Sequence, residues 1–270
     1  MTSSDANFGK TCSFMRYCIF CDNQAKTREH LWPEWILKKV KPGKVTGFIG
    51  HNTNLTFTAE WKVRTVCKSC NEGWMSALEV ANTPLIGPPI DDISITLSEP
   101  QQWAIAAWSV KTAMVMDSTT VAARPLFYTQ TERDELKSSS LTPRGTAVWL
   151  GRFLGLRSIG AVSVDTKYRI SGVDELCPGR ITTFLLGALV IQVMTVHILP
   201  EYGDRRIRID PAQGPWDHLL VTAWPTAGRK IYWPPILAFD DSGTLTDLST
   251  LFDRWELGTQ VPLAPKSKIN

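Results

Sequence analysis

The stretches Cys18-Ile19-Phe20-Cys21 and Cys67-Lys68-Ser69-Cys70 have the same Cys-x-x-Cys spacing. Both pairs lie in the first third of this chain of 270 residues. In a reducing compartment such pairs indicate metal binding rather than disulfide bonds. Zinc prefers four ligands in a tetrahedron, and each pair offers two thiolates on a short turn. We therefore predict one structural zinc ion bound by Cys18, Cys21, Cys67 and Cys70, which closes the intervening 45 residues into a loop.

The composition is that of a globular protein, with 43% hydrophobic residues, 20% charged residues and a formal net charge of +3. The charge is uneven: residues 1–80 contain 11 Lys and Arg against 7 Asp and Glu, whereas residues 81–270 contain 18 against 19. This basic excess beside the cysteine pairs favours a polyanionic partner, although it is too small to establish nucleic-acid binding by itself.

Neither a signal peptide nor a membrane span is expected. Residues 1–15 lack an apolar stretch, and the apolar run 181–199 is interrupted by polar residues and by Gly187, which suits two buried strands. We therefore expect a soluble cytoplasmic protein.

The spacing of apolar residues predicts the elements around the cysteine pairs. A short helix should begin just after His30 and end before Pro42-Gly43. Residues 45–49 and 55–66 have β character and are separated by a polar turn, which predicts a hairpin, and residues 72–80 should form a helix.

Residues 83–92 hold three prolines and a glycine, which predicts a linker between two domains. Beyond it, helices are expected over 100–117, over 131–138 with Thr131 as the cap, and over 247–255. Strands are expected over 147–153, 159–164, 181–187, 189–197 and 219–223. The predicted fold class is α+β, with a zinc-braced domain (1–82), a linker (83–92) and an α+β domain with a mainly antiparallel sheet (93–270).

Further residues beside the cysteines suggest catalysis, because a closed four-thiolate zinc site leaves no open position for it. The stretches are Arg28-Glu29-His30-Leu31-Trp32-Pro33 and Cys67-Lys68-Ser69-Cys70-Asn71-Glu72-Gly73-Trp74. Over residues 18–79 the pattern resembles the HNH, or His-Me finger, endonucleases and is similar to their four-cysteine endonuclease VII branch. That family commonly has an acidic-His pair with a proline three residues later, and His or Asn directly after the last cysteine. The resemblance implies a ββα-metal unit in the first domain and cleavage of DNA, one cut or nick per active site.

The resemblance also assigns roles. His30 would be the general base, while Glu29 and Asn71 would hold a catalytic Mg²⁺ or Mn²⁺. The residue types suit these roles, because an imidazole can accept a proton near neutral pH and hard cations prefer oxygen ligands. Each also has a structural alternative: His30 at a helix start, Asn71 as a helix cap, and Glu29 as a solvated charge.

Other candidates stay open. Arg28, Arg64 and Lys68 would contact phosphates or remain solvated charges, and neither Asn52 nor Asn54 matches the family's middle asparagine cleanly. Residues 93–270 carry no motif tied to chemistry, so this domain would recognise substrate, bind a protein partner or form a homodimer. His197 is expected to be structural.

The alternative function is a catalytically silent, zinc-stabilised module that binds nucleic acid or acts as an adaptor. Retention of Glu29, His30 and Asn71 favours the nuclease, since such a module could lose all three without harm to the zinc. By family analogy, a nuclease of this kind would serve phage defence or a mobile element. The sequence does not distinguish DNA from RNA, or a duplex from a branched substrate.

Overall fold

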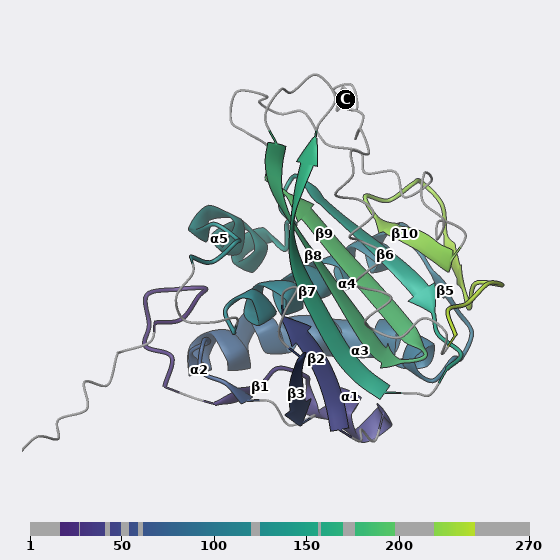
Figure 1. Ribbon diagram of the computed structural model, residues 1–270, viewed down its shortest axis with the longest axis horizontal. Coiled ribbons are helices and arrows are strands. Elements are labelled where there is room, and N and C mark those ends of the chain that lie inside the picture. Colours follow the sequence, from purple (N-terminus) through teal and green to yellow (C-terminus); the bar gives the residue numbers. More distant parts are fainter. Residues whose placement is uncertain are drawn as a thin grey trace, which may run out of the picture.

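The structure is a computed structural model that describes residues 17–26, 28–40, 44–49, 54–58, 62–119, 125–155, 158–169, 176–197 and 219–240. Within these ranges the chain has an α+β fold, with helices packed against one face of a sheet (Figure 1). The described residues include no helix that is long and apolar enough to cross a membrane. The helix predicted over 247–255, His51 and Asn52 lie outside the described ranges.

Five antiparallel strands form the main part of the sheet, in the order β10-β6-β9-β8-β7. They are β6 (Thr146–Arg152), β7 (Ser158–Arg169), β8 (Leu176–Gly187), β9 (Leu189–Val196) and β10 (Leu220–Trp224). All of β9 is buried, as expected for a central strand with apolar residues on both faces. The predicted antiparallel sheet is confirmed, and residues 181–196 form two buried strands as predicted.

The turn between β8 and β9 requires glycine at position 187. Its φ is +61°, and a Cβ atom there would lie 2.6 Å from the carbonyl oxygen of Ile90. The amide of Ala188 donates to the same oxygen at 3.0 Å. Gly187 thus lets the hairpin contact the end of the helix that Ile90 terminates.

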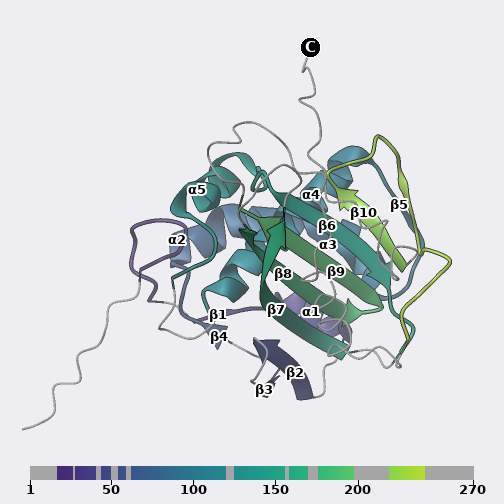
Figure 2. The ribbon, with the colours of Figure 1, turned by 45° about the horizontal axis from the view of Figure 1, so that its top comes forward.

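Two long helices cover the sheet, as Figures 1 and 2 show. Helix α4 (Glu99–Asp117) contacts β9 and β10, and α3 (Ser76–Ile90) packs on α4. The shorter helices are α1 (Glu34–Val40), α2 (Lys68–Cys70) and α5 (Gln130–Ser139), and a π-type turn, η1 (Asn71–Met75), joins α2 to α3. Near α1, Trp32 packs edge-on against Phe184 of β8, with ring centres 5.5 Å apart. The first part of the chain therefore shares a core with the sheet.

Residues 83–92, predicted as an irregular linker, mostly belong to α3. The helix continues through three prolines, each of which removes a backbone N–H donor. Leu85, Ile86 and Ile90 are buried in the main core, and this burial offsets the lost hydrogen bonds. The irregular structure predicted for this segment is therefore wrong, while the division into two domains stays a prediction.

The predicted hairpin is present but shorter than expected. Strands β2 (Lys44–Ile49) and β3 (Asn54–Thr58) pair antiparallel, whereas β4 (Lys62–Val63) pairs separately with β1 (Glu29–His30). Because β2 also pairs in parallel with β7, the hairpin extends the sheet to seven strands. Strands β5 (Ile95–Leu97) and β11 (Ile231–Trp233) form a separate pair.

The cap predicted for α5 is also corrected. Thr129, not Thr131, precedes the helix: its hydroxyl accepts from the amide of Glu132 at 3.2 Å, and the Glu132 carboxylate accepts from the amide of Thr129 at 2.7 Å. This reciprocal pair is a capping box, in which Thr129 is the N-cap residue and Glu132 is the third residue of the helix. The box therefore starts two residues earlier than predicted.

Candidate metal centre and adjoining cleft

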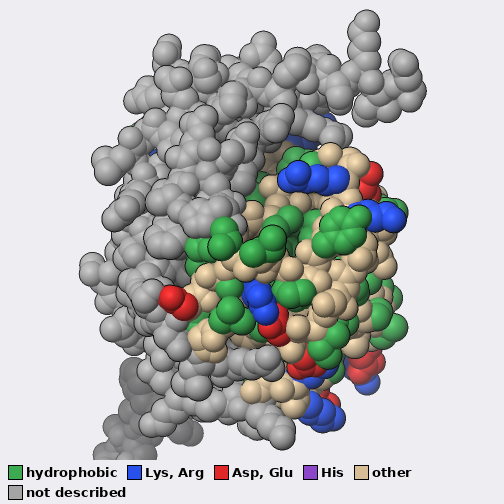
Figure 3. Space-filling model, turned by 90° about the vertical axis from the view of Figure 1, so that its right-hand side faces the viewer, with side chains coloured by type: hydrophobic (Ala, Val, Ile, Leu, Met, Phe, Trp, Pro, Cys, Tyr) green, Lys and Arg blue, Asp and Glu red, His purple; other side chains and the backbone are tan. Residues whose placement is uncertain are grey.

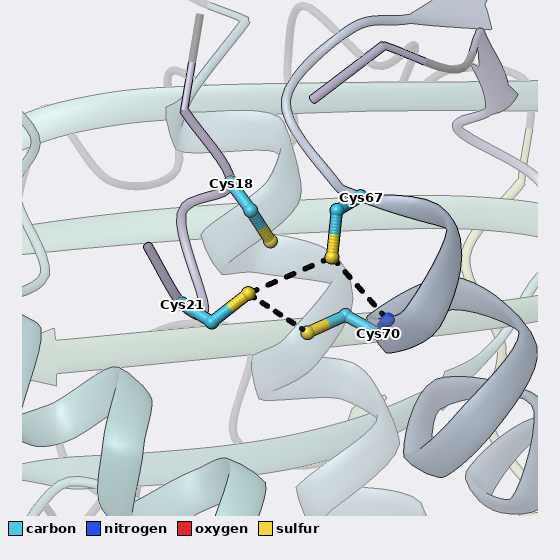
Figure 4. A group of neighbouring side chains, drawn as sticks. All are labelled: Cys18, Cys21, Cys67 and Cys70. Carbon is cyan, nitrogen blue, oxygen red and sulfur yellow. Dashed lines mark hydrogen bonds between the residues drawn. The ribbon is translucent and has the colours of Figure 1, made fainter. Parts of the chain in front are cut away.

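The four predicted zinc ligands come together in one cluster (Figure 4). Their Sγ atoms all lie within 4.8 Å of one another, and Cys21 is 3.5 Å from Cys67 and 3.6 Å from Cys70. Zinc–sulfur bonds of about 2.3 Å in a tetrahedron place the sulfurs about 3.8 Å apart. The cluster of Cys18, Cys21, Cys67 and Cys70 therefore fits a structural zinc ion.

Local hydrogen bonds favour the thiolate form of Cys67. Burial by itself would raise the pKa of this thiol, but hydrogen bonds from Ser69, the Cys70 amide and neighbouring thiols together lower it to about 6. At Cys18 and Cys70, by contrast, burial raises the pKa. A divalent cation supplies the positive charge that lets all four sulfurs be deprotonated together.

Helix α5 holds the first cysteine turn through two cations. Arg133 is buried and donates from Nε to the carbonyl oxygen of Ile19 at 2.7 Å, and Lys137 donates from Nζ to that of Phe20 at 3.2 Å. Ile19 and Phe20 are the two residues inside the first Cys-x-x-Cys pair. Since zinc with four thiolates carries a net negative charge, these cations also stabilise the loaded site electrostatically.

Arg133→Met should weaken zinc retention without removing a ligand. Methionine fills much of the same buried volume but cannot donate to the carbonyl of Ile19, and loss of such supporting hydrogen bonds typically lowers metal affinity about 10–100-fold. We expect zinc transfer to a coloured chelator to be at least about tenfold faster than in the wild type. Arg229→Met, which changes an exposed arginine, is the control and should match the wild type. Equal transfer rates for Arg133→Met and the wild type would contradict this role.

A cleft of about 330 Å³ adjoins the cysteine cluster. His30 and Asn71, predicted from the sequence as general base and metal ligand, both line it. His30 is exposed and ends the short strand β1, while Asn71 is half-buried and directly follows Cys70 at the start of η1. Val63 and Val66, from the segment leading into the second cysteine pair, form part of the wall. Pairing of β1 with β4 thus brings His30 close to the segment that leads from β4 through the second cysteine pair to Asn71.

The other predicted residues lie as follows. Glu29 precedes His30 in β1 with its backbone opposite Val63, and its side chain lies outside the described part of the structure. Arg28 and Arg64 are exposed and are not among the described residues that line the cleft. Lys68 is also exposed and forms an ion pair of 3.7 Å with a glutamate one turn later, which contributes little to stability. Their proposed phosphate contacts stay predictions.

Four charged residues that line the cleft were not predicted: Glu34, Glu72, Glu79 and Lys111. Glu79 of α3 and Lys111 of α4 are the two that lie at the interface of the long helices. They form an ion pair of 2.5 Å, and their side chains are 18% and 5% exposed. A signal for Lys111 was available, because it is the one charged residue in the stretch 104–116. A lysine in such a helix is almost never fully buried unless it is paired.

The right-hand side of the molecule in Figure 1 has a different character. Viewed head-on in Figure 3, it shows hydrophobic side chains interspersed with both basic and acidic ones. The described residues there form a mixed surface rather than one continuous basic surface. Binding of a protein partner, or formation of a homodimer, through residues 93–270 stays a prediction.

Comparisons of the chain with protein-family models, curated proteins and solved structures found no match. The fold and site themselves define an α+β protein with a four-cysteine metal centre beside a cleft. Its function must therefore be inferred from the residues that line the cleft.

Proposed function

We propose that this protein is a metal-dependent endonuclease of the HNH type that hydrolyses DNA phosphodiester bonds, nicking one strand per active site. The observation that carries the proposal is that His30 and Asn71 line one cleft next to the four-cysteine cluster. Further support comes from the antiparallel pair β1 and β4, which is followed by α2 and by the π-type turn η1 that begins with Asn71; α1, β2 and β3 lie between the two strands in the sequence. A cytoplasmic location and a role in phage defence or in a mobile element belong to the same proposal.

His30 would act as the general base. Its exposure at the rim of the cleft makes the imidazole accessible to a phosphodiester and to the attacking water, from which it would take a proton. The carboxylate of Glu29 and the side-chain oxygen of Asn71 would hold a hard divalent ion, since Mg²⁺ and Mn²⁺ prefer oxygen ligands. When bound, such an ion neutralises charge on the scissile phosphate and on its leaving oxygen.

The cysteine cluster would have a supporting role in this reaction. Thiolates select zinc and oxygen atoms select Mg²⁺, so the two sites do not compete for one ion. Because Asn71 is bonded to Cys70, a filled zinc site holds the start of η1 in place. The amide of Asn71 also donates to the carbonyl oxygen of Cys67 at 3.0 Å. Such support would preorganise Asn71 before the substrate arrives.

Purified protein should convert supercoiled plasmid DNA to the nicked form when Mg²⁺ or Mn²⁺ is present. Brief addition of EDTA should stop the reaction, and excess Mg²⁺ should restore it whereas Zn²⁺ should not, because the catalytic ion is a hard one. Agarose gels follow the conversion. Nicking that persists without a hard ion would contradict the proposal, and tight DNA binding without cleavage would favour the silent zinc-stabilised module instead.

A further inference from the structure

The cleft contains a buried ion pair that the proposed hydrolysis does not use. Lys111 Nζ lies 2.5 Å from Glu79 Oε1 and 5.3 Å from the centre of the Trp108 ring, in the interface between α3 and α4. His30 is exposed whereas Lys111 is almost fully buried, so His30 lies at the rim of the cleft and the ion pair at its floor.

The ion pair leaves part of the glutamate unsatisfied. Among the described residues, Glu79 Oε2 is buried without a hydrogen-bond partner. The indole nitrogen of Trp35, a residue that also lines the cleft, is likewise buried without a partner. Buried polar atoms without partners are rare in folded proteins because each costs free energy, so each calls for an explanation. An acceptor and a donor at one cleft are the groups that a polar ligand needs.

The surroundings of Glu79 define the kind of ligand. A further cation would gain little, because Lys111 already neutralises the carboxylate. An uncharged N–H donor would gain a hydrogen bond to Oε2 without repulsion from the lysine. The walls combine polar side chains with apolar ones against which a planar ring can pack, and the volume falls in the usual range for small-molecule sites of about 300–1,000 Å³. The apolar residues are Leu31, Pro33, Trp35, Val63, Val66, Met75, Val80 and Val115.

We propose that this cleft binds one unpaired nucleobase of the substrate strand, with Glu79 Oε2 accepting a hydrogen bond from the amino group of the base. The inference rests on the proposed function and makes it narrower: the substrate is single-stranded or locally unpaired beside the cleavage site. Carboxylates accept from the amino group of cytosine, whereas uracil presents a carbonyl oxygen at the same position, which a carboxylate repels. An amino-bearing base is therefore preferred.

Binding of oligodeoxycytidylate and oligodeoxyuridylate tests this preference, because cytosine has an amino group beside an unprotonated N3, whereas uracil has a carbonyl oxygen beside an N3–H. Fluorescence anisotropy measures both affinities with the full-length, zinc-loaded protein, in buffer without Mg²⁺ or Mn²⁺ so that neither strand is cut. We expect the cytidylate to bind about tenfold more tightly. In Glu79→Gln the preference should fall below about twofold, because the amide can present either an acceptor or a donor to the base. Glu135→Gln, which changes an exposed glutamate of α5, is the matched control and should keep the preference.

Three results would overturn the nucleobase site: equal affinities in the wild type, binding of neither strand, or an unchanged preference in Glu79→Gln. The last of these, combined with a lower thermal midpoint, would show that the ion pair only fixes α3 against α4. If Glu79→Gln does not fold, Glu79→Gln/Lys111→Met removes both charges at similar volume and tests the same preference. If the wild-type protein prefers the cytidylate but does not nick plasmid DNA, the proposed endonuclease is overturned and the nucleobase site stands.

Discussion

A Cys70→Ser variant is expected to purify with less than about a tenth of the zinc of the wild type and to unfold at least roughly 10 °C lower. Structural zinc contributes about 10–16 kcal/mol of apparent binding free energy in small domains. About a third of that, at about 2–4 °C per kcal/mol for a chain of this size, already lowers the midpoint by this amount. Metal analysis and thermal unfolding followed by circular dichroism measure the two effects.

The effect should be large because the cluster joins two cysteine turns that are separated by 45 residues in the sequence, and the other contacts between them lie at the same turns. The amide of Ile19 donates to the carbonyl oxygen of Thr65 at 2.9 Å, and Phe20 packs edge-on against Trp74 with ring centres 4.9 Å apart. Both contacts lie at the cysteine turns, so both weaken when zinc is lost. The loss would then reach the cleft, since Asn71 follows the last cysteine.

Cys177→Ala is the control for the zinc prediction. Cys177 is a fully buried cysteine of β8 outside the cluster, so its loss should leave zinc content unchanged and lower the midpoint by only a few degrees. A wild-type protein that binds no zinc, or a Cys70→Ser variant as stable as the wild type, would show that the four cysteines are ordinary thiols without a structural metal.

The cysteine cluster could be predicted from the sequence because the spacing of its ligands is local information. A Cys-x-x-Cys turn presents two sulfurs on one side wherever it occurs, and two such turns need only to meet. The ion pair between Glu79 and Lys111 could not be predicted in this way. It depends on how α3 packs on α4, and no local pattern states which helix a buried lysine will face.

The same distinction separates the correct and incorrect parts of the fold. Helix α4 was predicted as residues 100–117 and is Glu99–Asp117, because the spacing of its apolar residues is itself local information. The irregular structure predicted over 83–92 was wrong because proline is only a local signal, and buried Leu85 and Ile86 outweigh it. The joining of β2 to β7 was missed because it pairs residues from distant parts of the chain.

His30→Ala is expected to lower the rate of plasmid nicking by about 10²–10⁴-fold, the usual contribution of a positioned general base. Zinc content should not change, because His30 is not a member of the cysteine cluster. The free energy of unfolding should change by no more than about 0.5 kcal/mol, as for most exposed side chains. Loss of activity with an intact fold is therefore the expected combination.

His197→Ala is the matched control because it should lower stability without lowering the rate of nicking. His197 stacks on Phe127 with ring centres 4.2 Å apart and contacts Glu132 at 3.4 Å, away from the residues that line the cleft. Its removal should lower the thermal midpoint but leave nicking close to the wild-type rate at a temperature where the variant is folded. The two histidine variants thus separate a loss of chemistry from a loss of stability.

The measurement that bears most directly on the role of this cleft is the initial rate of plasmid nicking by His30→Ala and by the wild type, at equal zinc content and saturating Mg²⁺. If His30 is the general base of a phosphodiester hydrolase, the variant should be at least about a hundredfold slower. A variant rate within about twofold of the wild-type rate would contradict that assignment.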